Sequence, residues 1–152
     1  MPKRVTGSEA LAKRMAAIPQ SVLEALRPAL TRSVQEIAAD ARALAESSRR
    51  SGALVESIEA TAPGETTPAF ASDGGRRTAD EGQAFVTAGD PDARHGHLVE
   101  FGTAERVHKD GSPTGTMPAK PFLLPAWRLN KTRVRNRLRR VIRSEVKKGA
   151  AE

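Results

Sequence analysis

Residues 21–48 read SVLEALRPALTRSVQEIAADARALAESS and decide the first half of the fold. Their apolar side chains recur at steps of three or four residues, which is the period of one face of an α-helix. Ser21 and Glu24 have the spacing of a capping box, in which each side chain satisfies a backbone amide at the start of a helix. Pro28 is expected to kink this helix or to restart it. The stretch therefore predicts a long amphipathic helix packed on a sheet. Its apolar stripe consists of Leu23, Leu26, Leu30, Val34, Ile37, Ala41 and Leu44.

Further helices, strands and loops are predicted on both sides of this helix, up to residue 126. A shorter helix is predicted over about 8–18, with Ser8 as its cap and Pro19 as its stop. Strands are predicted within about 58–101, and residues 95–101 fit either a strand or a short helix. The candidate strands are 58–62, 66–72 and 83–88. Glycines and prolines recur over 102–120, which predicts a long exposed loop. The result is an α+β fold, with the long helix on a small, mostly antiparallel sheet, in a single domain over residues 1–126.

The remaining residues, 127–152, predict a basic C-terminal helix and tail. The helix is expected to start near Pro125, and Pro121 and Pro125 hold the chain before it extended. Phe122 and Trp127 are therefore expected to be buried at its start. The apolar positions predicted to form one stripe of the helix are Trp127, Val134, Leu138, Val141, Ile142 and Val146.

The net charge of +7 is concentrated in this helix. Between residues 128 and 148 there are ten basic residues and one acid, whereas the rest of the chain has 15 basic and 17 acidic residues. A helix rich in arginine can neutralise nucleic-acid phosphates, pair with an acidic protein surface, or be a solvated face, and all three interpretations stay open. Asn130 and Asn136 are too few to read a base sequence. The candidate DNA- or partner-binding residues are Arg128, Lys131, Arg133, Arg135, Arg137, Arg139, Arg140 and Arg143.

Length and composition exclude several classes of protein. The 152 residues suit one ordinary domain, and the absence of cysteine excludes a disulfide scaffold, a thiolate zinc site and a cysteine nucleophile. No apolar run is long enough for a membrane span, and the first residues lack the apolar core of a secretory signal, so we expect a soluble protein made in the cytoplasm. Only 3% of the residues are aromatic, which predicts a thin core completed by contacts with other subunits.

The sequence offers no positive sign of catalysis. His95, His97 and Glu100 are the only cluster that resembles metal ligands, and no recognised spacing completes it, so we expect no metal and no cofactor. Phosphate-binding glycine loops, nucleophile elbows and zinc-protease helices are absent from the sequence. Glu100 is expected to accept backbone amides in the turn at 102–103, while Val99 and Phe101 are expected to add to the core. We therefore expect that the protein is not an enzyme.

Three stretches, in order and at matching spacing, resemble a known family. Residues 51–58 (SGALVESI), 96–103 (GHLVEFGT) and 118–126 (PAKPFLLPA) are similar to its TGxLxxSI, AxxVEFGT and PARPFLRPA elements. The family is that of the neck or tail-completion proteins of long-tailed bacteriophages, similar to the minor tail protein Z of phage lambda. Lys120 and Leu124 stand where the family usually has arginine. The structural positions of these motifs are Gly52, Leu54, Ile58, Glu100, Phe101, Gly102, Thr103, Pro121, Phe122, Pro125 and Trp127.

The resemblance implies a virion structural protein at the phage head-to-tail junction. In that role it is a ring subunit that joins the capsid connector to the tail around the DNA channel. The implied partners are further copies of the chain and adjacent head-closure, tail-terminator or tail-tube proteins, with nonspecific contact to packaged DNA and no membrane partner. The implied location is the virion neck or tail, and the host cytoplasm during assembly.

Two alternatives come from other classes of protein. One is a small nonspecific nucleic-acid-binding module that uses the arginine-rich helix. The other is a metal-dependent nuclease, which requires His95, His97 and Glu100 to bind an ion.

Overall fold

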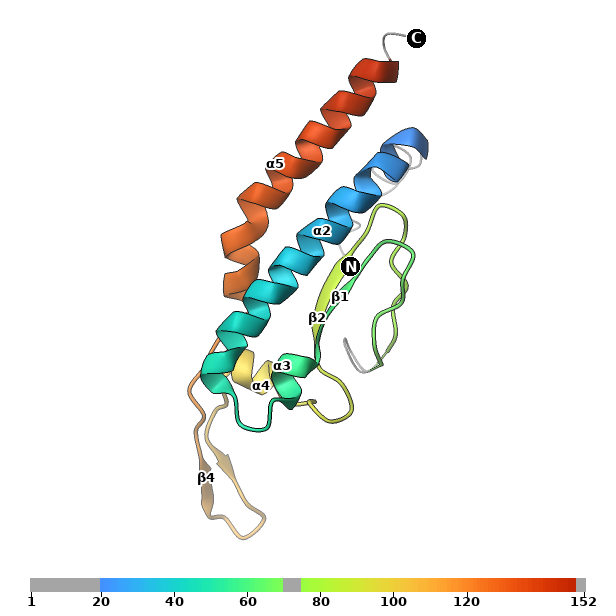
Figure 1. The fold of residues 1–152 in the computed structure, drawn as a ribbon. Helices are drawn as coiled ribbons and strands as arrows, with labels where there is room; N and C mark the ends of the chain where they lie inside the picture. Colours follow the sequence, from blue (N-terminus) through green and yellow to red (C-terminus); the bar gives the residue numbers. More distant parts are fainter. Residues whose placement is uncertain (1–19, 70–74, 150–152) are drawn as a thin grey trace, which may run out of the picture.

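Two long antiparallel helices, α2 and α5, lie side by side along the molecule (Figure 1). The computed structural model describes residues 20–69 and 75–149. Helix α2 spans Gln20–Ala45 and continues into a 3-10 turn, η1, at Glu46–Ser48, while α5 spans Leu123–Gly149. The α+β class and the two long helices are confirmed.

The helix boundaries differ slightly from the prediction. α2 continues through Pro28 without a restart. This exposed proline lacks one backbone hydrogen bond of the helix, but the apolar residues before and after it remain packed in the core. α5 begins at Leu123, two residues before Pro125, so this proline occupies the first turn, where its missing amide costs nothing. The helix predicted over 8–18 lies outside the described residues.

The core is built mainly from small and medium-sized side chains. α2 and α5 approach one another through Ala38, Ala41 and Ala126, each of them fully buried. Phe122 is the single aromatic side chain in the buried cluster. The cluster consists of Ile37, Ala38, Ala41, Ala45, Leu54, Ile58, Val99, Phe122, Ala126 and Val134. Residues of α2, α3, β1, α4 and α5 therefore meet at one core.

A two-stranded antiparallel sheet also contacts α2. Strand β1 (Ile58–Thr61) pairs with β2 (Phe85–Ala88), with Ile58 opposite Ala88 and Thr61 opposite Phe85. Arg27 and Arg42 of α2 donate to the carbonyl oxygens of Pro63 and Ile58, which fixes the sheet on the helix. The predicted strands at 58–62 and 83–88 are confirmed.

The third predicted strand, 66–72, is described only over 66–69, and these four residues form no continuous strand. Within 66–69, the described part of the segment 66–72, the structure has an isolated bridge between Thr66 and Thr78. Small and polar residues around this bridge give a longer strand little to pack against the core.

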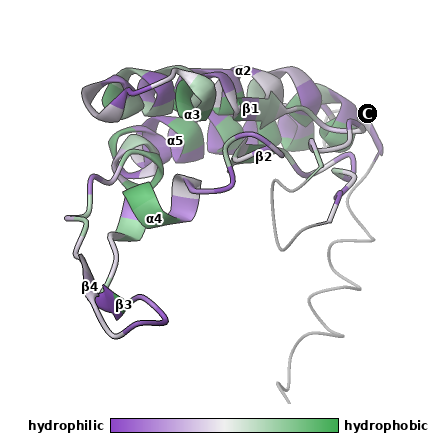
Figure 2. Cartoon of the chain, turned by 90° about the horizontal axis from the view of Figure 1, so that it is seen from below, coloured by the Kyte–Doolittle hydropathy of each residue, from purple (hydrophilic) through white to green (hydrophobic). Residues whose placement is uncertain are grey.

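Two short helices and a hairpin complete the fold. Helix α3 (Ala53–Glu56) follows Gly52, and the segment 95–101 forms helix α4 (Gly96–Phe101), not a strand. The predicted loop at 102–120 contains strands β3 (Arg106–Val107) and β4 (Pro113–Gly115), which pair irregularly. Figure 2 shows this hairpin apart from the helices, and both of its strands are exposed. Among the described helices, none has the length and apolarity that a membrane span requires.

Candidate functional site

Glu100 joins helix α4 to the start of helix α5. Its Oε2 accepts the backbone amides of Phe122 and Leu123 at 2.8 and 2.9 Å, and its Oε1 accepts that of Leu124 at 2.9 Å. The first amides of a helix have no partner within the helix, and a carboxylate there is also favoured by the helix dipole. Glu100 therefore caps α5, and not the turn at 102–103 as predicted.

The residues after Glu100 hold the chain that leads into α5. Thr103 donates its backbone amide to the Met117 carbonyl at 2.9 Å, and its Oγ1 accepts the Met117 amide at 2.9 Å. Gly102 has a φ of 74°, and a Cβ at this position would lie 2.8 Å from both the Ala119 amide nitrogen and the Met117 carbonyl oxygen. Only glycine fits there. The EFGT element is a clamp on residues 117–124.

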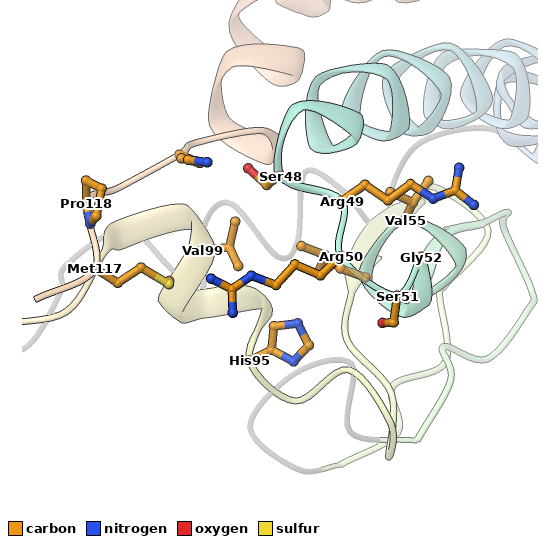
Figure 3. A pocket seen from close by; sticks show the side chains of 12 residues that line it. Ser48, Arg49, Arg50, Ser51, Gly52, Val55, His95, Val99, Met117 and Pro118 are labelled. Atoms are coloured by element: carbon orange, nitrogen blue, oxygen red, sulfur yellow. The ribbon is translucent and has the colours of Figure 1, made fainter. Parts of the chain in front are cut away.

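All three sequence motifs meet at one pocket, shown in Figure 3. The first motif contributes Gly52 and Leu54, the second Val99, and the third Pro118 and Lys120. The pocket has a volume of about 450 Å³. The lining also includes Ser51 and Val55 of the first motif, together with Ser48, Arg49, Arg50, His95 and Met117. The three motifs thus connect α3, α4 and the start of α5, and the pocket lies where they meet.

The predicted basic residues of α5 fall into two groups. Arg137 is only 18% exposed; it donates to Ser33 Oγ at 2.8 Å and to both carboxylate oxygens of Glu36 at 2.8 Å. The hydrogen bonds that Arg137 donates to Glu36, together with one from Arg32, hold the pKa of Glu36 below its ordinary value. Arg133 adds a longer ion pair to the same carboxylate, at 3.8 Å. Arg137 therefore joins α5 to α2.

The other predicted basic residues face solvent. Arg139, Arg140 and Arg143 line a shallow groove with Asn136, Ser144 and Lys147, a lysine that was not among the predicted binding residues, and this groove is formed by α5 alone. In the described part of the chain these four cations have no ion pair. We call them the outer basic face. Arg128, Lys131 and Arg135 are also exposed, nearer the start of α5.

Several predicted contacts of single residues are wrong. Trp127 is 47% exposed and Phe101 is 70% exposed, whereas Phe122 is buried as predicted. Phe101 is exposed because the adjacent Glu100 points inward to cap α5, and neighbours on this helix turn face different directions. Trp127 lines a surface groove between α2, β2 and α5. Ile142 and Val146 are exposed as well, because they lie in the C-terminal half of α5 outside the buried cluster.

Asn130, considered as a reader of bases, and Glu100, considered as a metal ligand, both make hydrogen bonds within the fold. Asn130 is buried and donates to Asp40 Oδ2 at 2.5 Å and to the Ala126 carbonyl at 3.0 Å, so it is not presented to a base edge. Both oxygens of Glu100 are occupied by backbone amides, while His95 and His97 are exposed. No group of three metal-ligating side chains occurs among the described residues.

Residues 9–102 match a known protein family, described as "Bacteriophage HK97-gp10, putative tail-component". The match covers more than half of the chain. The chain belongs to this phage tail-component family. Comparisons with curated proteins and with solved structures find no match.

Membership in the family gives the protein a structural role related to the phage tail, in the virion and among other virion proteins. The matched residues include α2, the β1–β2 sheet and α4 up to Gly102, so they contain the first motif and all of the second except Thr103. The third motif and α5 lie beyond the match. Likeness to the lambda minor tail protein Z in particular stays a prediction.

Proposed function

We propose that this tail component is a ring subunit of the phage head-to-tail junction, joining the capsid connector to the tail around the DNA channel. The proposal is supported by the family and by one observation above all: α5 packs against α2 with one face and presents the outer basic face on another. In a ring, such a face suits a lumen filled with DNA. Its direct neighbours would be head-closure, tail-terminator or tail-tube proteins.

Exposed apolar residues support association between subunits. Phe101 and Val107 are 70% and 67% exposed, at the end of the molecule that carries the hairpin. Trp127, Leu129 and Val146 are 47%, 67% and 58% exposed on α5. A contact between two different surfaces of identical subunits closes into a ring when the rotation allows it. The thin core described above favours a subunit that gains stability from such contacts.

The assembly is tested with the purified chain by native mass measurement and electron microscopy. We expect a closed ring, and Phe101→Asp is expected to reduce it to smaller species because it places a charge in an apolar contact. Phe101 is mostly exposed in the single chain, so the variant should fold normally. Thr132→Asp, which adds the same charge at an exposed polar position of α5, serves as the matched control.

A chain that stays monomeric alone and forms no ring with the proteins on either side of the junction would contradict the proposal. If the Phe101→Asp variant still forms rings, the ring proposal stands, and Phe101 does not lie in the contact between subunits.

The second candidate, a nonspecific nucleic-acid-binding module working alone, is favoured by the same outer basic face. It predicts a monomer or dimer that coats DNA, whereas the junction proposal predicts a ring. The mass of the assembly in the absence of DNA therefore separates the two.

A further inference from the structure

The pocket where the three motifs meet contains two cations without a partner. Arg49, on its rim, is paired with Glu46 at 3.1 Å. The side chains of Arg50 and Lys120 make no hydrogen bond or ion pair with any residue that the structure describes, although the backbone amide of Lys120 donates to the Val99 carbonyl at 2.8 Å. Figure 3 shows the side chain of Arg50 extending across the pocket, with Val99 and His95 on its two sides. The lining contains no aspartate or glutamate, so the pocket carries positive charge with no counter-ion in its own wall.

The rest of the lining combines apolar surface with an unused hydroxyl. Leu54 and Val99 are buried, and Val55 and Met117 are half-buried. Ser48 Oγ, also in the lining, is buried and has no hydrogen-bond partner in the described part of the chain. A buried polar group without a partner is uncommon in native proteins. It indicates a place where a polar group of a ligand can bind.

This combination selects the chemistry of the ligand. An arginine and a lysine that line one pocket suit a carboxylate or a phosphate. The apolar surface at Leu54, Val99 and Met117 adds binding free energy only for a ligand with apolar atoms next to its charge. A DNA backbone presents phosphates and sugars, whereas a glutamate or aspartate beside a leucine-like side chain presents both features. The pocket also lies near α3 and α4, at the opposite end of the helix pair from the outer basic face (Figure 1).

We propose that this pocket binds an acidic residue flanked by apolar residues, carried by an exposed segment of an adjoining virion protein. Arg50 and Lys120 hold the carboxylate, and the apolar wall holds the flanking side chain. The proposal rests on the proposed place of the protein at a junction between other subunits. It gives a reason for a lysine or arginine at position 120, next to the clamp that Glu100 and Thr103 form.

The experiment is a titration of the full-length chain by nuclear magnetic resonance, with two synthetic peptides as probes. They are acetyl-Leu-Glu-Leu-amide and acetyl-Leu-Gln-Leu-amide, which differ only in the carboxylate. We expect the glutamate peptide to shift the methyl signals of Leu54, Val99 and Met117 and the side-chain signal of Arg50 along one saturable curve. The glutamine peptide should bind about tenfold more weakly, because it lacks the charge.

Variants separate this pocket from general charge attraction. Arg50→Gln combined with Lys120→Gln should weaken the glutamate peptide by about tenfold, while the unchanged spectrum elsewhere reports that the chain is folded. Arg128→Gln combined with Lys131→Gln removes the same charge from exposed positions of α5 and should leave the affinity within about twofold.

Four outcomes would overturn the proposal: equal affinity for both peptides, no shift at about 20 mM peptide, shifts confined to the outer basic face, or an unrelated DNA duplex that shifts the Arg50 signal. The ring is measured separately. If the chain forms a ring but does not bind the glutamate peptide, only the pocket proposal is contradicted. If it binds the peptide but forms no ring, only the junction proposal is contradicted.

Discussion

Arg137 and Glu36 connect the two long helices, with Arg137 Nη2 2.8 Å from each oxygen of the Glu36 carboxylate. The side chains are 18% and 24% exposed, so the pair lies at the edge of the helix interface and not free in solvent. Arg137 also donates to the buried Ser33 hydroxyl at 2.8 Å. One of the arginines that gives α5 its charge is therefore part of the packing between the helices.

The first prediction concerns the stability that this pair supplies. Glu36→Gln should lower the free energy of unfolding by about 1 kcal/mol at neutral pH, a value reduced for partial exposure. The pKa of Glu36 is lowered from the ordinary 4.5, mainly by the hydrogen bond from Arg137. Its stabilising effect is therefore complete above the ordinary pKa and is lost as the pH falls through the lowered one. Urea unfolding of both proteins, from neutral pH to about pH 3, should show their difference shrinking with acid.

Glu105→Gln is the control for this prediction, since Glu105 is exposed and makes no hydrogen bond or ion pair in the described part of the chain. A difference between the Glu36 variant and wild type that grows in acid would contradict the assigned pair.

The second prediction concerns the cap of α5. Glu100→Ala leaves three backbone amides without their acceptor, and should cost about 2–4 kcal/mol of unfolding free energy. Glu100→Gln keeps one oxygen acceptor and loses the charge at the helix start, so its cost should be smaller but measurable. Chemical unfolding of both variants tests this order. If the free energy of unfolding of the alanine variant lies within about 0.5 kcal/mol of wild type, Glu100 does not stabilise the start of α5 as a cap.

The third prediction compares two glycines with nearly the same backbone conformation. Gly102 has a φ of 74° and Gly111 a φ of 82°, so alanine should cost about 1 kcal/mol at either position. A Cβ at Gly102 also meets two backbone atoms at 2.8 Å, whereas one at Gly111 meets nothing within 4 Å. Gly102→Ala should therefore cost at least about 2 kcal/mol more than Gly111→Ala. Equal losses in thermal or urea unfolding would show that the close contact at Gly102 is easily relieved.

Helical periodicity predicted the long elements well because it repeats over many turns. Leu26, Val34 and Ile37 recur at helical spacing and are all buried in α2. The strands β3 and β4, by contrast, have two and three exposed residues, so their hairpin leaves no apolar alternation in the sequence. A hairpin without an apolar face cannot be distinguished from a loop by its sequence pattern.

The partners of single polar residues were beyond sequence reasoning because they are distant in the chain. Glu100 is separated by more than 20 residues from the amides it caps, and Arg137 by about 100 from Glu36. Arg137 and Arg139 both lie in the arginine-rich stretch 133–143, and the position of α2 distinguishes them. The sequence pattern does not indicate a role for Arg50, because the motif beside it starts at Ser51, although the fold places both residues in one pocket.

The last prediction tests the outer basic face. Deleting residues 128–152 is not a clean test of DNA binding, because Asn130 and Val134 are buried against the rest of the fold. Substitution avoids this problem. Arg139→Gln, Arg140→Gln and Arg143→Gln together should weaken binding to unrelated DNA duplexes and lower the slope of log affinity against log salt by about 3, close to one for each lost phosphate contact.

A matched variant decides whether this loss belongs to the face. Arg76→Gln, Arg106→Gln and Lys109→Gln remove the same net charge from exposed positions outside α5. If the outer basic face contacts DNA, this second variant should change the salt slope by less than about one. Equal loss in both variants would mean that net charge alone drives binding. An unchanged slope in the first variant would exclude phosphate contact by the outer basic face and leave an acidic protein neighbour or a solvated face, because unpaired arginines suit carboxylates equally well.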